Sequence, residues 1–156
     1  CFFESREPIF IQQRVGKHLK LFKLFKFRTM KKNTPSKASH LINENSVTRF
    51  GKILRLLKLD ELPQLINVLN GDMSLVGPRP CLPNQLELIK WREKYNLHNI
   101  KPGITGLSQI KGIDMSDPKK LAQSDFLMIS RINQLYYFKY LLLTFFGKGR
   151  GDKVKK

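Results

Sequence analysis

Acidic residues, cysteine and long hydrophobic runs are scarce in this sequence. Its 156 residues hold 12 Asp and Glu against 29 Lys and Arg, so the formal net charge is +17 at pH 7. The two cysteines and three histidines lie far apart and have no metal-binding spacing, which argues against a disulfide framework or a structural zinc site. The longest apolar stretch, near residues 140–146, is much shorter than the roughly 20 residues of a membrane-spanning helix, so no such helix is predicted in this chain.

The excess of positive charge predicts a polyanionic partner. Nucleic acid, anionic lipid and phosphorylated small molecules all meet this requirement, and charge alone does not choose among them. The sequence has neither the G-x-x-x-x-G-K-[ST] of a P-loop nor the G-x-G-x-x-G of a dinucleotide-binding fold. It also has no helix-turn-helix, zinc-finger or RNP motif, so a nucleic-acid-binding module remains an alternative that explains the charge and little else.

The N-terminal part of the chain predicts a β-hairpin. Residues 9–29 read as two extended segments that meet at the Gly16-Lys17 turn. Residues 31–47 are polar and contain a proline, so we expect a loop there. Two further stretches rich in Gly and Pro, 71–80 and 100–112, are also expected to be loops or turns.

Helices account for most of the rest. A helical pattern begins near residue 50, but Pro63 cannot lie inside an undisturbed helix, because its ring clashes with the preceding turn. We therefore expect a break near Leu59 and a second short helix that starts close to Asp60 and runs to Leu69, where Asn70-Gly71 stops it.

The C-terminal part predicts a helix over 84–97 and a longer one that starts at Asp117-Pro118 and runs to about Phe146 with a weak point inside it. The end of that helix, YYFKYLLLTFF, is apolar nearly all round. It suits a buried core helix, or an interfacial helix that meets lipid together with the basic tail. Together these elements predict a small single α/β domain with a short hairpin or partly antiparallel sheet and several amphipathic interfacial helices.

An adjacent pair of acids, Asp60 and Glu61, is unusual in so basic a chain. The pair suits the N-terminus of a helix, where free N–H groups favour negative charge. It also suits a carboxylate nucleophile or a metal site, because carboxylates attack phosphoryl groups when cations neutralise the phosphate. Arg55, Lys58 and Arg79 are close enough in sequence to supply those cations.

Two further motifs point to phosphate. In the segment GPRP, prolines on both sides of Arg79 restrict the backbone that carries the guanidinium, and a fixed guanidinium suits bidentate contact with phosphate oxygens. In KFRTM, at the end of the second predicted strand, Lys26 and Arg28 place two cations beside a hydroxyl. Each motif alone also fits an ordinary solvated loop or strand end.

Three segments in order, FIQQRVGKHLKLFKLFKFRTM, TRFGKILRLLKLDELPQLINVLNGDMSLVGPRP and IKPGITGLSQIKG, together resemble the bacterial sugar transferases. These are monotopic polyprenyl-phosphate phosphoglycosyl transferases, and the resemblance covers roughly residues 2–147. It implies that a UDP-sugar gives its sugar-1-phosphate to polyprenyl (undecaprenyl) phosphate, which releases UMP and initiates assembly of a capsule, exopolysaccharide, O-antigen or glycoprotein glycan. It further implies Mg²⁺, a covalent phospho-sugar enzyme, and a place at the cytoplasmic face of the bacterial inner membrane, in contact with membrane lipid and not with nucleic acid.

The resemblance also implies roles for single residues. Asp60 matches the nucleophile of the Asp-Glu pair, Glu61 its partner, and both together the metal site. Arg55 and Arg79 match the arginines that hold phosphate, and Lys26 and Arg28 match the cations at the strand end.

The match has departures. Family members normally begin with a hydrophobic helix that enters the membrane, and here the resemblance starts at REPIFIQQRVG, so we expect that helix to be missing from an N-terminally truncated catalytic domain, 1–147. Residues 148–156 are expected to form a basic flexible tail. Tyr137 stands where relatives often carry Asp. A non-catalytic membrane-surface scaffold is therefore the second alternative; neither the sugar nor the oligomeric state follows from the sequence.

Overall fold

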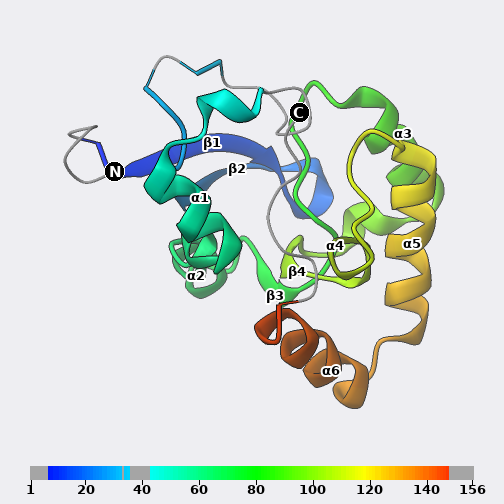
Figure 1. Cartoon of the computed structure of the whole chain (residues 1–156). Helices are drawn as coiled ribbons and strands as arrows, with labels where there is room; N and C mark the ends of the chain where they lie inside the picture. Colours follow the sequence, from blue (N-terminus) through cyan, green and yellow to red (C-terminus); the bar gives the residue numbers. More distant parts are fainter. Residues whose placement is uncertain (1–6, 33, 36–42, 148–156) are drawn as a thin grey trace.

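The computed structural model describes residues 7–32, 34–35 and 43–147. Short helices surround two two-stranded sheets, so the predicted α/β class is confirmed at the level of a small mixed domain (Figure 1). The strands and α-helices are β1 (Ile9–Val15), β2 (Leu21–Phe27), α1 (Arg49–Leu56), α2 (Gln64–Leu69), β3 (Ser74–Val76), α3 (Leu86–Lys94), β4 (Gly103–Thr105), α4 (Leu107–Ile110), α5 (Pro118–Arg131) and α6 (Gln134–Phe145). The 3-10 helices are η1 (Lys17–Leu19), η3 (Glu44–Ser46), η4 (Leu59–Glu61) and η5 (Leu97–Asn99).

The predicted hairpin is confirmed. Strands β1 and β2 pair antiparallel, with Ile9 opposite Phe27 and Val15 opposite Leu21. The connection closes where Gly16 N donates to Lys20 O at 2.8 Å. Cys1, His40 and the tail 148–156, on which the sequence also carried expectations, lie outside the described residues.

The break between the first two helices is also confirmed. Lys58 takes a left-handed conformation (φ 57°), which stops the helical path after α1. The second helix starts later than predicted, at Gln64, and a separate 3-10 turn holds Asp60 and Glu61. The reason is Pro63, which has no N–H to donate and is accommodated at the N-cap of α2.

The prediction that 71–80 and 100–112 contain only loops and turns is wrong. β3 and β4 form a parallel pair in which Ser74 and Val76 face Gly103 and Thr105. The two backbones lie very close here, since a Cβ on Gly103 would collide with the backbone nitrogen of Gly77. Three-residue strands that pair across almost 30 residues leave no alternation to detect, whereas the glycines that permit the contact resemble turn residues.

The C-terminal helices follow the capping signals. The Asp117 side chain accepts from Lys120 N at 3.0 Å and starts α5, and the Asn133 side chain accepts from Tyr136 N at 2.9 Å and starts α6. The predicted weak point is therefore the junction at Ile132-Asn133. Helix α3 is shorter than the predicted 84–97, because left-handed Asn96 ends it before η5.

The core has two parts. One part lies between α3 and α5 and contains Leu88, Leu121 and Ala122; the other joins β3, α5 and α6 through Val76, Met128 and Tyr140. A buried ion pair crosses the first part, because Arg92 Nη2 lies 2.7 Å from Asp125 Oδ2 and Ser108 Oγ donates to Asp125 Oδ1 at 2.7 Å. The second part packs against β3, which directly precedes the loop that carries Arg79.

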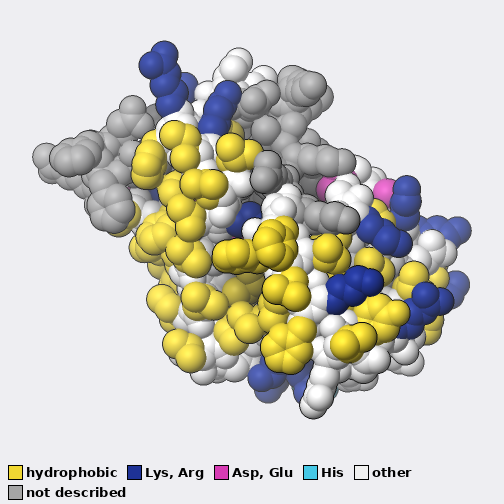
Figure 2. Space-filling view, turned by 60° about the horizontal axis from the view of Figure 1, so that its bottom comes forward, with side chains coloured by type: hydrophobic (Ala, Val, Ile, Leu, Met, Phe, Trp, Pro, Cys, Tyr) yellow, Lys and Arg dark blue, Asp and Glu magenta, His cyan; other side chains and the backbone are white. Residues whose placement is uncertain are grey.

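Hydrophobic side chains cover much of one face. Figure 2 shows them gathered there with Lys and Arg nearby. They come from α1, η4, α2 and α6: Phe50, Ile53, Leu56, Leu57, Leu59, Leu62, Leu65, Ile66, Leu69, Leu135, Phe138, Leu142, Phe145 and Phe146. For most of the α6 stretch the core interpretation is therefore wrong, since Phe138 is 64% and Phe145 85% exposed while Tyr140 is buried. Within the described ranges, no helix has the length and apolar character needed to cross a membrane.

Candidate active site

The acid pair lies on η4, at the turn between α1 and α2. Left-handed Lys58 redirects the chain so that Asp60 points inward, where only 7% of it is exposed. The Glu61 side chain is 17% exposed. Buried carboxylates require cations or hydrogen-bond donors around them, and the surrounding elements provide several.

Lys26, at the end of β2, makes the closest contact with the pair. Its Nζ lies 3.0 Å from Glu61 Oε1, and both side chains are largely buried. Burial would raise the pKa of Glu61, but the charges of Lys26 and Arg79, with the hydrogen bond from Lys26, outweigh it and lower that pKa to about 2. Glu61 is therefore a fixed negative charge at any physiological pH.

Asp60 has the opposite shift. Burial raises its pKa above the ordinary value and the charge of Glu61 adds to this rise, while Lys26 and Arg55 oppose it. The pKa values of the two adjacent acids are therefore shifted in opposite directions. An ion pair keeps Glu61 ionised, and Asp60 is the more basic carboxylate. Basicity in a carboxylate increases its capacity as a nucleophile.

Arg55 reaches the pair from the last turn of α1. Its Nε donates to Thr29 Oγ1 at 2.8 Å, which fixes the guanidinium, and its Nη1 is buried without a hydrogen-bond partner in the described part of the chain. The charge of Arg55 opposes the rise in the pKa of Asp60, and Asp60 opposes the fall in the pKa of Arg55, as expected of two charged groups near each other.

Arg79 approaches from the other side, on the loop that follows β3. Its charge lowers the pKa of Glu61 and also contributes to the lowered pKa of Lys26 and Lys58, for both of which burial is the first cause. The loop is fixed at Pro78 and Pro80, because Pro78 O accepts from Gly103 N at 2.8 Å and Pro80 O accepts from Arg14 at 3.0 Å.

The site carries more positive than negative charge. Five cations surround the two carboxylates: Arg14, Lys26, Arg55, Lys58 and Arg79. For the first four of them the pKa is lowered, and burial is the largest cause. Desolvated like charges repel, so this arrangement is stabilised by an added anion. A phosphate or diphosphate has the charge and the acceptor oxygens that the site needs.

One predicted site residue is directed elsewhere. Arg28 bonds to Glu7, with Nη2 3.2 Å from Glu7 Oε2 and Nε 3.0 Å from Glu7 O, and its guanidinium lies over the Phe10 ring. The structure therefore brings Lys26, Arg55, Asp60, Glu61 and Arg79 together and leaves Arg28 outside the group.

Sequence reasoning missed Gln12 and Arg14. Both are buried on β1, at 8% and 9% exposure, whereas Ile9 and Ile11 on the same strand are exposed. The usual alternation of apolar residues inward and polar residues outward is inverted here. The segment IFIQQRV does not alternate strictly, so only the structure shows that the inner face of the hairpin is polar.

The carboxylates suit only one kind of metal site. Among the described residues, no group of three His, Cys, Asp or Glu side chains is placed to hold a metal ion. Mg²⁺ commonly takes one or two protein carboxylates and completes its shell with water and substrate phosphate. Asp60 and Glu61 match that mode, and a closed all-protein cage is not present in this part of the chain.

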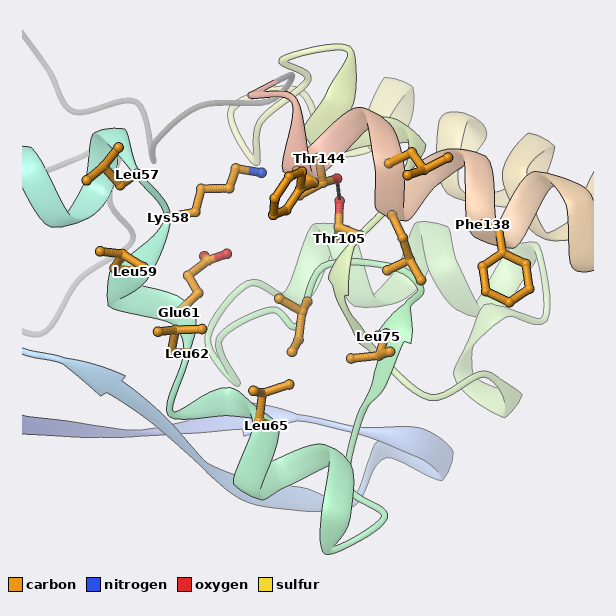
Figure 3. A pocket seen from close by; sticks show the side chains of 14 residues that line it. Leu57, Lys58, Leu59, Glu61, Leu62, Leu65, Leu75, Thr105, Phe138 and Thr144 are labelled. Atoms are coloured by element: carbon orange, nitrogen blue, oxygen red, sulfur yellow. Dashed lines mark hydrogen bonds between the residues drawn. The ribbon is translucent and has the colours of Figure 1, made fainter.

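An apolar pocket of about 630 Å³ opens beside the acid pair. Figure 3 shows it between η4 and α2 on one side and α6 on the other, with Lys58 and Glu61 at one end. Leucines and Phe138 form most of its lining, and Thr105 and Thr144, whose hydroxyls lie 2.5 Å apart, add a small polar element. A ligand that fills this pocket must combine an apolar body with an anionic end.

Comparison with known proteins gives a family match over almost the whole chain. The sequence profile of the family described as bacterial sugar transferase matches residues 1–149. The "Uncharacterized sugar transferase EpsL" of Bacillus subtilis is 43% identical over 138 residues, which are 88% of this chain and 68% of that protein.

Two relatives carry more specific names. The "UDP-N-acetylgalactosamine-undecaprenyl-phosphate N-acetylgalactosaminephosphotransferase" of Aeromonas hydrophila is 36% identical over 158 residues, 92% of this chain. The "UDP-glucose:undecaprenyl-phosphate glucose-1-phosphate transferase" of Escherichia coli is 46% identical over 108 residues, 67% of this chain. The matched parts are only 37% and 23% of these two longer proteins.

Proposed function

The chain belongs to the bacterial sugar transferase family, and from this we propose that it transfers sugar-1-phosphate from a UDP-sugar to polyprenyl (undecaprenyl) phosphate and releases UMP. The observation that carries the proposal is a buried carboxylate of raised pKa, Asp60, enclosed by cations that favour a diphosphate. Two relatives are named as enzymes that use a UDP-sugar and undecaprenyl phosphate, which supports the same substrates here.

The first step in this proposal is attack by Asp60. A carboxylate oxygen attacks the phosphorus that carries the sugar, the bond from that phosphorus to the UMP oxygen breaks, and UMP leaves with the electron pair. The product is a phospho-sugar ester of Asp60. In the second step an oxygen of polyprenyl phosphate attacks the same phosphorus and the bond to Asp60 breaks, which restores the carboxylate and forms the polyprenyl-diphospho-sugar.

The cations make attack by one anion on another feasible. Arg55, fixed by Thr29, and Arg79, fixed by its loop, are suited to hold phosphate oxygens and to neutralise the charge that develops on them. Glu61 keeps Lys26 charged and in place beside the nucleophile. Bound anions also offset the repulsion among the cations, so substrate binding and site assembly reinforce each other.

Magnesium belongs to the same proposal. When bound, Mg²⁺ supplies charge neutralisation and orientation to the phosphates. Asp60 and Glu61 are the residues that would hold it, in the one- or two-carboxylate mode that leaves room for phosphate oxygens.

The apolar face and the pocket suit a lipid acceptor. The helices α1, α2 and α6 expose a continuous set of large hydrophobic side chains, which in a basic protein suits the surface of an anionic membrane (Figure 2). The pocket beside Lys58 suits the first part of the polyprenyl chain with its phosphate toward the acid pair (Figure 3). The proposed location is the inner membrane of a bacterium, on the cytoplasmic side where nucleotide sugars are made.

The test is release of UMP. The purified protein is incubated with undecaprenyl phosphate, Mg²⁺ and a panel of UDP-sugars, beside Asp60→Asn and the control Asp117→Asn, which keeps a helix cap far from the site in sequence. We expect UMP from one sugar with the native protein and with the control, and none with Asp60→Asn. Folded, membrane-bound protein that releases no UMP and traps no labelled phospho-sugar would instead favour a non-catalytic scaffold.

A further inference from the structure

The Pro-Arg-Pro loop is held by a buried arginine to which the proposed reaction assigns no task. Arg14 Nη1 donates to Pro80 O at 3.0 Å, and the backbone of the next residue in β1 continues the contact, since Val15 N donates to Cys81 O at 2.9 Å. On the other side of Arg79, Gly103 N donates to Pro78 O at 2.8 Å. The backbone that carries Arg79 is therefore bound both before and after it.

Arg14 is an unusual choice for such a contact. It is 9% exposed, and its acceptors are neutral, namely Pro80 O and Gln12 Oε1, the latter at 2.6 Å from Nη2. Within the described residues it makes no ion pair, and its Nε is buried without a hydrogen-bond partner. A buried guanidinium without a carboxylate costs free energy, and a neutral amide would satisfy the Pro80 carbonyl without that cost.

The charge of Arg14 adds to that of the site. Burial and the nearby charge of Arg79 lower the pKa of Arg14 to about 10, while Glu61 opposes the shift, so the side chain stays positive at neutral pH. Because Arg14 binds the carbonyl of Pro80, the residue after Arg79, two like charges are kept near each other. An anion that binds Arg79 also relieves its repulsion with Arg14.

We propose that Arg14 is a positioning residue for the phosphate site. It holds the backbone of Arg79 through the Pro80 carbonyl, and its charge strengthens the attraction that Arg79 has for a diphosphate. The identity of the ligand as a diphosphate rests on the proposed function; the hold of Arg14 on the loop that carries Arg79 rests on the hydrogen bonds alone.

A double-mutant cycle tests this dependence with inorganic diphosphate as the probe. Its affinity is measured by calorimetry for the native protein, Arg14→Gln, Arg79→Gln and the double variant, and the unfolding temperature of each is recorded. Lys23→Gln, an exposed lysine on β2, is the control for the loss of one charge on the same hairpin. We expect Arg14→Gln to weaken binding about tenfold in the native background and less than about twofold when Arg79 is already Gln, whereas Lys23→Gln leaves it nearly unchanged.

The outcomes separate the alternatives. Equal losses in the two backgrounds, or no loss in a folded Arg14→Gln variant, would overturn the proposal and leave Arg14 a structural residue. If Arg14→Gln does not fold, Arg14→Met, which removes the charge and the donor to Pro80 O but keeps an unbranched side chain, is placed in the same cycle with the same criterion. Coupled binding of diphosphate without any UMP release would overturn the proposed reaction and keep the role of Arg14. UMP release with uncoupled binding would keep the proposed reaction and overturn the role of Arg14. A native protein that binds no diphosphate would overturn both the reaction and the role of Arg14.

Discussion

Lys26 Nζ lies 3.0 Å from Glu61 Oε1, although 35 residues separate the two in the sequence. The contact joins the end of β2 to the turn between α1 and α2. It therefore fixes the position of the acid pair relative to the hairpin. Asp60, next to Glu61, takes its place from this ion pair. The same contact therefore contributes to stability and to the arrangement of the proposed nucleophile.

The Glu61→Gln substitution is expected to destabilise the protein by about 3 kcal/mol at neutral pH, because it removes the carboxylate from a buried ammonium group. The pKa of Glu61 is lowered to about 2 from 4.5, so the carboxylate stabilises the folded state above pH 4.5, and this contribution is lost as pH falls toward 2. Denaturant unfolding from pH 7 to pH 3 measures the difference between native and variant protein, which should narrow below pH 4.5.

Removing both partners provides the control. In Lys26→Met with Glu61→Gln no charged group of the pair remains, so the double variant should be less destabilised than the sum of the single variants. Additive losses would show that the two residues contribute independently, and the ion pair would then not fix the turn.

Asp60→Asn is expected to affect stability in the opposite sense. The pKa of Asp60 is raised in the folded protein, so the folded state binds its proton more tightly and stability falls as pH rises above 3.8. Asparagine avoids this loss of stability. The variant should therefore be at least as stable as the native protein at pH 7, while its UMP release drops about a thousandfold or more.

Thermal unfolding measures the stability and the UMP assay measures the activity. A clear loss of stability at pH 7 would mean that Asp60 is a structural ion-pair residue.

The sequence was sufficient where structure depends on neighbouring residues. Pro63 predicted the helix break, Asp117-Pro118 predicted the start of α5, and the Gly16 turn predicted the hairpin, because proline and capping groups act within one turn of the chain. Closeness in sequence was also the reason to expect the charge of Arg55 near Asp60.

The sequence alone was insufficient where the structure depends on contacts between residues far apart in the chain. The pairing of β3 with β4 joins segments almost 30 residues apart, and no local pattern encodes it. Arg28 and Lys26 are equally plausible cations at a strand end, but only the fold shows that Arg28 turns to Glu7. Arg14 was missed because the segment IFIQQRV does not show which face of β1 lies inward.

The pH dependence of the reaction follows from the same charges. If Asp60 must be ionised to attack, activity should fall at acid pH with a midpoint above 3.8, since burial raises the pKa of Asp60. Lys26 lowers that pKa, so Lys26→Met should move the midpoint of the residual activity to higher pH. Burst amplitudes of UMP across pH measure both; a midpoint that stays in place in this variant would mean that another group controls the acid limb.

The pocket should affect the acceptor and not the nucleotide sugar. Leu142 on α6 lines the apolar pocket, and an aspartate there places a charge where a prenyl chain is proposed to lie. Leu142→Asp should raise the KM for undecaprenyl phosphate about tenfold or more and leave the KM for the UDP-sugar nearly unchanged. Leu135→Asp is the matched control, because Leu135 is 76% exposed on the same helix and does not line the pocket. Equal effects of the two variants would assign the loss to the membrane surface and not to the pocket.

The exposed apolar face should bind membrane directly. Leu69 on α2 is 86% exposed, whereas Leu86, 64% exposed, belongs to α3, a helix that lies away from α1, α2 and α6 (Figure 1). Because burial of a leucine side chain contributes about 2 kcal/mol, Leu69→Glu should weaken binding to anionic vesicles by more than tenfold. Leu86→Glu adds the same negative charge outside the face and should have little effect.

Sedimentation with phosphatidylglycerol vesicles at low and high salt separates the contribution of charge from that of apolar contact, because salt screens the basic surface and leaves the apolar contact intact. Equal loss from both variants, abolished by salt, would mean that charge alone holds the protein to the membrane.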